Sequence, residues 1–218
     1  MFKRAFCFCI LALALALTGG FIDGGDKKGK DKKDDPKYNN PTFVPTADEV
    51  IEKMFEMGKI NKKDLIFDLG CGDNRICFMA AKKFGCRGVG IETNPVRIRE
   101  AMDMFDKFNK DDAIVFGPVK LPLVETRHGD ALAMKDIGDA TVVVMYMFPE
   151  FMELWLPIAK AKLKPGTRIL SHDYAWDYES DKTKWAPVST AIVKSSSRDN
   201  HKVLMWVVPE KKSTKAAK

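Results

Sequence analysis

A glycine turn flanked by carboxylates is the part of the sequence best suited to bind a charged ligand. The turn, Gly70–Gly72, follows the apolar run Leu65–Leu69, and Asp68 and Asp73 stand on either side of it. An apolar run that ends in Gly-x-Gly predicts a buried strand that breaks sharply into a helix. A second short run, Gly88–Ile91, is followed by another acid. This order predicts a βαβ unit with a ligand loop after its first strand and a carboxylate after its second.

The charges of this loop indicate which nucleotide-type ligand it would bind. A dinucleotide loop needs G-x-G-x-x-G, where the pyrophosphate rests on backbone N–H groups, but Arg75 stands at the third glycine position. Asp68 and Asp73 would repel a pyrophosphate and attract a ligand that carries an ammonium and a sulfonium. Glu92 can accept hydrogen bonds from the ribose hydroxyls of either ligand, so it does not distinguish a dinucleotide from a ligand with a sulfonium. The loop therefore predicts S-adenosylmethionine as the cofactor, in preference to a nicotinamide dinucleotide.

These residues resemble a known family. D-L-G-C-G-D followed by Glu92 resembles motif I and the ribose-binding acid of the class I, seven-β-strand methyltransferases. The order of elements over Phe43–Val208 is similar to theirs, and F-V-P-T, D-L-G-C-G-D-N-R-I and G-x-E-x-N-P resemble a branch that contains protein-lysine methyltransferases. The resemblance implies an α/β, Rossmann-like, doubly wound and mostly parallel seven-stranded sheet with helices on both faces and a reversed last strand. It implies methyl transfer to an unidentified acceptor, for which a protein lysine amine is one candidate.

The resemblance also implies which residues contact the cofactor. In Gly129–Ala131, Asp130 stands where the family uses an acid to accept a hydrogen bond from the adenine amino group, and the next backbone N–H reaches a ring nitrogen. The predicted cofactor-binding residues are Asp68, Gly70, Cys71, Gly72, Glu92, Asp130 and Ala131.

Polar residues near the ends of two later strands are candidates for the acceptor side, because ligands of open α/β sheets bind at the carboxyl ends of strands. Strands are predicted over 140–148 and 167–171, and the predicted catalytic residues are Tyr146, His172 and Asp173. His172 is either a general base or a hydrogen-bonded structural residue. Many class I enzymes carry an Asn/Asp-Pro-Pro-Tyr motif after the fourth strand, which Tyr146 and Phe148-Pro149 only loosely resemble. This departure argues against a DNA-amino or glutamine methyltransferase.

The remaining elements frame this unit. The T-x-x-E box at Thr46–Glu49 predicts the start of a helix that ends at Gly58 and either covers the ligand or covers the sheet edge. Further helices are predicted over 74–84, from Asn94-Pro95, and over 150–163, and two closing strands over 188–194 and 202–208. The loop that precedes these two strands, 173–187, contains Trp176 and Trp185 and is either a substrate lid or a packed surface loop.

The net charge of +6 is concentrated at the two ends of the chain. Residues 1–40 contain eight basic and five acidic residues, and 210–218 contain four and one, whereas 41–209 contain 24 of each. Specific binding of nucleic acid is therefore not expected. The predicted organisation is a signal peptide (1–20), a charged flexible linker (21–40), a methyltransferase domain (41–209) and a basic disordered tail (210–218).

The predicted signal peptide has Lys3 and Arg4 before the apolar run Ala5–Leu17, and small residues follow. This run is too short to span a hydrocarbon core of about 30 Å comfortably, so a cleaved signal is favoured over an anchor. We expect export or a cell-envelope location, with contact to the membrane only through this segment. The location is cytoplasmic if the segment is not used.

Cysteine and histidine spacing predicts neither disulfides nor a metal site. The three cysteines beyond the targeting run lack C-x-x-C spacing, and the histidines, His128, His172 and His201, are scattered along the chain. The absence of G-x-S-x-G and G-x-x-x-x-G-K argues against hydrolases and P-loop proteins. Two alternatives to the methyltransferase stay open. One is an exported protein that keeps the fold without turnover, and the other is a nicotinamide-dependent oxidoreductase.

Overall fold

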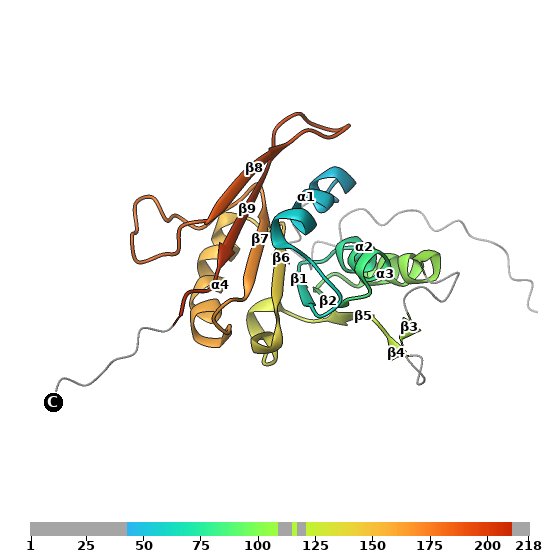
Figure 1. The fold of residues 1–218 in the computed structure, drawn as a ribbon. Helices are drawn as coiled ribbons and strands as arrows, with labels where there is room; N and C mark the ends of the chain where they lie inside the picture. Colours follow the sequence, from blue (N-terminus) through green and yellow to red (C-terminus); the bar gives the residue numbers. More distant parts are fainter. Residues whose placement is uncertain (1–42, 109–114, 117–120, 211–218) are drawn as a thin grey trace, which may run out of the picture. The chain divides into compact units, whose positions relative to one another are not determined.

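A computed structural model of the chain describes residues 43–108, 115–116 and 121–210 (Figure 1). The predicted signal peptide, the predicted linker and residues 211–218 of the predicted tail lie outside them. Within the described part of the chain, no helix is long and apolar enough to cross a membrane.

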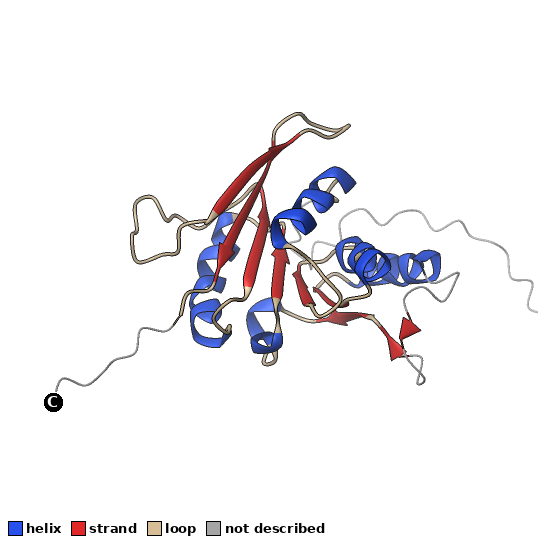
Figure 2. Ribbon diagram, viewed as in Figure 1, coloured by secondary structure: helices blue, strands red, loops and turns tan. Residues whose placement is uncertain are grey.

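The central feature is a seven-stranded sheet in the order β5-β2-β1-β6-β7-β9-β8 (Figures 1 and 2). In this sheet β9 runs antiparallel to both of its neighbours, β7 and β8, and all other neighbouring strands are parallel. The predicted doubly wound sheet with a reversed last strand is therefore confirmed. The strands are β1 (Leu65–Leu69), β2 (Arg87–Glu92), β5 (Val124–His128), β6 (Val142–Met145), β7 (Arg168–His172), β8 (Ser189–Val193) and β9 (His201–Val207). A separate antiparallel pair consists of β3 (Val115–Phe116) and β4 (Leu121–Pro122).

Helices cover both faces of the sheet, as predicted. On one face lie α1 (Asp48–Gly58), α2 (Arg75–Phe84) and α3 (Pro95–Phe108), and on the other lie α4 (Pro149–Lys162) and the short 3₁₀ turns η1 (Ala131–Ala133) and η2 (Ile137–Asp139) (Figure 1). Successive side chains of the central strands point to opposite faces of the sheet, so each strand contributes apolar residues to the hydrophobic core on both faces. Ile66 and Val144 pack on the α1–α3 side, and Phe67 and Val143 pack on the α4 side.

Two local predictions were wrong. β6 ends at Met145 and not at Phe148, because its partner β1 ends at Leu69, directly opposite Met145. The N-cap of α1 is Ala47, without a side-chain hydrogen bond. The hydroxyl of Thr46 lies instead 3.3 Å from Nδ1 of His172, so the residue read as a helix cap connects α1 to the end of β7.

The structure bears on two pairs of alternatives. α1 packs against β7, β8 and β9 and therefore covers the sheet. The loop over 173–187 is packed and is not a free lid. Trp176 is 1% exposed, and its ring centroid lies 4.4 Å from that of Trp206. Both indole N–H groups donate to the carbonyl of Trp185, at 2.6 Å from Trp176 and 2.9 Å from Trp206.

Candidate active site

The glycine turn between β1 and α2 is tight and closely covered. Gly70 and Gly72 have φ angles of 71° and 56°, in the left-handed region that favours glycine. The N–H of Gly70 donates to the carbonyl of Ile91 over 2.9 Å, which fixes the turn to β2. A Cβ atom on Gly72 would lie 2.0 Å from the ring of Phe43, and one on Gly70 would lie 2.5 Å from the sulfur of Met147. The turn thus requires both glycines.

Glu92 connects this turn to the end of the neighbouring strand. Its carboxylate accepts hydrogen bonds from the backbone N–H groups of Gly72 (2.9 Å) and Asn94 (2.8 Å). Its carbonyl accepts one from Gly129 over 3.0 Å, which places Asp130 and Ala131 beside it. Asp130 is exposed, and its carboxylate accepts from the N–H of Leu132. The predicted cofactor residues therefore meet at the adjacent carboxyl ends of β1, β2 and β5.

Asp68 is a buried acid without a full set of partners. It is 2% exposed, and its Oδ2 has no hydrogen-bond partner among the described residues. Burial raises the pKa of Asp68 well above its ordinary value, and the nearby charges of Asp73 and Glu92 raise it further. Asp73, by contrast, forms a 2.6 Å ion pair with Arg75. The turn thus presents one unpaired carboxyl in a negative environment, which fits the cationic groups of S-adenosylmethionine and not a pyrophosphate.

The acceptor-side candidates meet at the ends of β6 and β7. The hydroxyl of Tyr146 donates to Asp173 over 3.2 Å, and Asp173 also accepts from Arg198 (2.6 and 2.7 Å) and from the N–H of Lys202 (2.9 Å). Burial alone would raise the pKa of Asp173, but the hydrogen bonds from Arg198 and Lys202 outweigh it and the pKa is lowered. Burial and the charge of Asp173 raise the pKa of Tyr146. The pair is therefore a carboxylate and a neutral phenol at neutral pH.

His172 is enclosed by the protein. It is 1% exposed; Nδ1 contacts the hydroxyl of Thr46, and Nε2 lies 2.9 Å from Nδ1 of His201. Burial lowers the pKa of His172 to about 4, and His201 and Arg198 contribute to the decrease. Because both ring nitrogens already have partners inside the protein, the geometry favours the structural interpretation of His172 over the general base.

Two residues of this cluster, Arg198 and His201, were not among the predicted site residues. Arg198 lies in the turn between β8 and β9 and His201 is the first residue of β9, and neither segment carries a motif. The signal that could have found them is the reversed strand itself. Its antiparallel pairing with β7 sets Val203 opposite His172 and brings the turn before β9 to the site.

Aromatic rings line the same edge of the sheet. The rings of Tyr146 and Tyr174 are stacked with centroids 5.9 Å apart, and the ring of Phe148 lies 5.4 Å from that of Tyr174. Phe148 is 47% exposed. Of these rings, that of Phe148 is therefore accessible to an acceptor at this edge.

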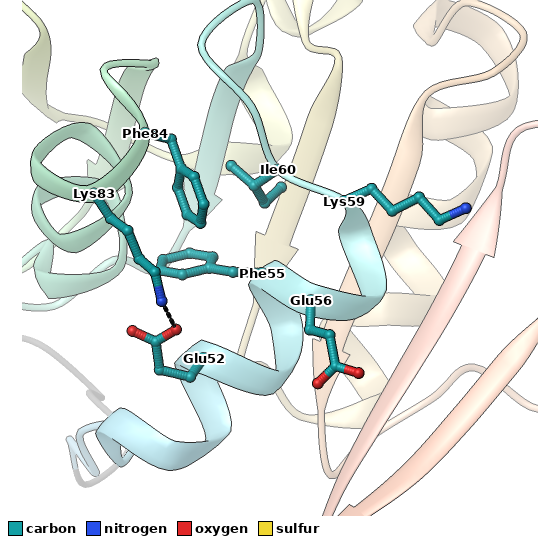
Figure 3. A pocket seen from close by; sticks show the side chains of 7 residues that line it. All are labelled: Glu52, Phe55, Glu56, Lys59, Ile60, Lys83 and Phe84. Atoms are coloured by element: carbon teal, nitrogen blue, oxygen red, sulfur yellow. Dashed lines mark hydrogen bonds and ion pairs between the residues drawn. The ribbon is translucent and has the colours of Figure 1, made fainter.

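A separate pocket of about 320 Å³ lies between α1 and the end of α2 (Figure 3). Its lining includes the edge-on pair Phe55 and Phe84 and the ion pair between Lys83 and Glu52 (Figure 3). None of the predicted cofactor or acceptor residues lines it. The active-site candidate is therefore the glycine turn and the strand ends beside it.

The strand order, the single reversed strand and the acid-flanked glycine turn define a class I methyltransferase. The chain belongs to the family of the ANTKMT methyltransferase domain, whose family model matches residues 68–181.

Relatives of known description agree with this assignment. A protein-lysine N-methyltransferase from Saccharolobus islandicus (strain REY15A) is 34% identical over 171 residues, which cover 78% of this chain and 95% of that protein. The crystal structure of an RNA methyltransferase from Salinibacter ruber in complex with S-adenosyl-L-homocysteine is 34% identical, with a TM-score of 0.63, and the match covers 77% of this chain and 95% of that one. A precorrin-6y C5,15-methyltransferase from Geobacter metallireducens GS-15, at 14% identity and a TM-score of 0.56, shares the fold over 81% of this chain and 96% of its own.

These comparisons confirm the predicted enzyme class and its cofactor. The protein is an S-adenosylmethionine-dependent methyltransferase. Neither the oxidoreductase nor the inactive exported protein finds support in them.

Proposed function

We propose that the protein transfers a methyl group from S-adenosylmethionine to the side-chain amine of lysine in a protein. The Saccharolobus relative, which matches over nearly its whole length, supports this acceptor. The observation that carries the proposal is the group of rings from Tyr146, Phe148 and Tyr174 next to Asp173. Aromatic faces and a carboxylate both attract an alkylammonium group.

An RNA acceptor, suggested by the description of the Salinibacter structure, is less well supported. Residues 41–209 contain 24 basic and 24 acidic residues, and binding of nucleic acid depends on an excess of positive charge.

In this proposal the predicted cofactor residues each bind a different part of S-adenosylmethionine. The buried carboxyl of Asp68 favours a cationic group beside the glycine turn. Glu92 accepts from the ribose hydroxyls with the capacity that its two backbone hydrogen bonds leave. Asp130 and the N–H of Ala131 contact the adenine.

The protein's own part in the reaction is to position the amine and to present it as a neutral nucleophile. The bound cofactor supplies an already activated methyl group. The hydroxyl of Tyr146 donates to Asp173, so its oxygen is free to accept an N–H of the amine and to orient the nitrogen lone pair toward the methyl group. The neighbouring rings of Phe148 and Tyr174 exclude water from one side.

The acceptor class is tested with isotopically labelled S-adenosylmethionine, the full chain and three acceptors. These are lysate proteins, the same proteins with their lysines blocked by reductive dimethylation, and total RNA. We expect label on lysine Nε in the first sample alone, located by mass spectrometry. Label on RNA, or on blocked proteins to the same extent, contradicts a lysine acceptor.

The role of the rings is tested with a matched pair of exposed apolar residues. Phe148→Ala should lower kcat/KM for the protein acceptor about tenfold, the size of one partly desolvated cation–π contact. Leu154→Ala on α4 removes a side chain that is 64% exposed, and it should leave the rate unchanged. Equal effects of the two changes would contradict the proposed acceptor site.

A further inference from the structure

Two buried histidines face each other beside Asp173. His172 is the last residue of β7 and His201 the first of β9, and they are 1% and 6% exposed. Nε2 of His172 lies 2.9 Å from Nδ1 of His201 and 3.5 Å from Oδ2 of Asp173. One ligand atom from each of the three residues lies within 4.8 Å of the other two.

We propose that His172, Asp173 and His201 bind a divalent transition-metal ion, with Zn²⁺ as the type case. Bonds of 2.0–2.1 Å in a tetrahedral site separate neighbouring ligand atoms by about 3.3 Å, and the observed 2.9 and 3.5 Å lie on either side of this value. Two imidazoles and a carboxylate suit zinc, iron or nickel better than calcium or magnesium. Three protein ligands would leave a fourth position open.

The outer nitrogens of both rings already have the partners that metal-bound histidines need. Nδ1 of His172 lies 3.3 Å from the hydroxyl of Thr46, and Nε2 of His201 lies 2.8 Å from the hydroxyl of Ser195. A ligating histidine usually donates its other N–H to such an acceptor, which fixes the ring and the tautomer. When both rings donate outward, two lone pairs face each other across 2.9 Å, and a cation between them relieves the repulsion.

Arg198 holds this cationic position in the structure described here. Its Nη2 lies 3.0 Å from Nδ1 of His201 and 2.6 and 2.7 Å from the two oxygens of Asp173. The side chain of Arg198 is 43% exposed and belongs to the turn between β8 and β9, so it can leave without disturbing the strands. We therefore expect the guanidinium and the metal ion to compete for two of the three ligands, Asp173 and His201.

The site is tested by metal binding alone, without cofactor or acceptor. The full chain is treated with a chelator, dialysed, and titrated with Zn²⁺ by calorimetry and with Co²⁺ by visible absorption. We expect one site per chain, with the absorption of a four-coordinate nitrogen and oxygen ligand set and no thiolate charge-transfer band. His201→Gln should weaken binding about a hundredfold or more, while His128→Gln, at an exposed histidine on β5, should not change it.

Arg198→Gln separates a metal site from a purely structural network. Removal of the competing guanidinium should tighten Zn²⁺ binding about tenfold or more, whereas a structural network would gain no affinity for metal. If His201→Gln is misfolded by circular dichroism, Ser195→Ala takes its place, with an expected weakening of about tenfold. The proposal is wrong if neither the natural chain nor Arg198→Gln binds metal, or if both histidine variants bind alike. Neither result would affect the proposed methyl transfer, which the assay does not involve.

Discussion

At the scale of single residues, the buried carboxyl of Asp68 destabilises the folded protein, and a bound cation would reduce this destabilisation. Its Oδ2 is buried without a partner among the described residues, close to the charges of Asp73 and Glu92. Such a group lowers the stability of the cofactor-free protein. Groups of this kind are expected in ligand-binding sites, where a residue is kept for binding although it destabilises the fold. Asp68 is therefore the residue at which the cofactor assignment can be tested most directly.

We expect Asp68→Asn to raise the free energy of unfolding of the cofactor-free protein by about 1–3 kcal/mol, because the amide cannot ionise, whereas burial and the charges of Asp73 and Glu92 disfavour the ionised carboxyl of Asp68. The same change should weaken S-adenosylmethionine binding about tenfold or more. Urea unfolding and calorimetric titration measure the two effects. Asp73→Asn is the matched control, and it should lower stability because Asp73 is paired with Arg75. A loss of stability in both variants would contradict this account of Asp68.

The same residue predicts a pH dependence. Because burial raises the pKa of Asp68, the folded protein keeps a proton over a pH range in which the unfolded chain has released it. The contribution of Asp68 to stability therefore falls as pH rises from the ordinary carboxyl pKa to the raised one. In Asp68→Asn this part of the pH dependence should be absent, which urea titrations across that range will show.

At the scale of elements, α2 lies close to β2 because β2 presents glycines to it. A Cβ atom on Gly88 would lie 2.6 Å from Cβ of Cys77, and one on Gly90 would lie 2.4 Å from Oδ1 of Asn74, the N-cap residue of α2. Neither neighbour is the end of a long, flexible side chain. The spacing of helix and sheet is thus set by the absence of side chains at these two positions.

Gly88→Ala should lower the free energy of unfolding by about 1–3 kcal/mol, because overpacking at this contact forces the helix away from the sheet. Gly129→Ala is the control, since a Cβ atom there meets nothing within 4 Å. We expect it to change the free energy of unfolding by less than about 0.5 kcal/mol. Urea unfolding of both variants tests this, and similar losses in the two would show that Gly88 is not a packing position.

Prediction from the sequence was most accurate for elements whose structure depends on their own local residues. Leu65–Leu69 is a strand with the predicted bounds, because an apolar run before a glycine turn has few alternatives. The end of β6 was not predictable in this way, since it depends on where β1 stops. Thr46 satisfies a capping pattern, yet its hydroxyl finds His172, 126 residues away in sequence. A local sequence pattern cannot show that a distant residue will take the hydrogen bond in place of the helix N-terminus.

In the candidate site, too, residues of local motifs were predicted and residues brought together by strand pairing were not. The glycine turn, Glu92 and Asp130 follow directly from a motif and come together as the sequence predicts. The network around Asp173 does not, because Arg198 and His201 reach it through the antiparallel strand β9. Only the register of that strand brings residues 29 positions apart, such as His172 and His201, into contact.

At the scale of the whole molecule, the described domain is compatible with the export that its N-terminus predicts. An oxidising compartment favours disulfides, but the three described cysteines, Cys71, Cys77 and Cys86, are free and buried. Burial raises the pKa of Cys86 to about 11, and it raises those of Cys71 and Cys77 as well. Thiols that stay protonated and enclosed react slowly, so we expect these three cysteines to stay reduced in an oxidising compartment.

We propose that residues 1–20 direct this export, and a fusion tests it. Residues 1–40 are placed before a reporter enzyme that is active only after translocation. We expect reporter activity with the natural segment and its loss in a Leu11→Arg, Leu13→Arg double variant, because charges in the apolar run prevent recognition as a signal. Lys27→Gln in the predicted linker is the control and should leave the activity unchanged. No reporter activity from the natural segment would contradict export, and equal activity from the natural and the doubly charged segments would contradict the role of the apolar run.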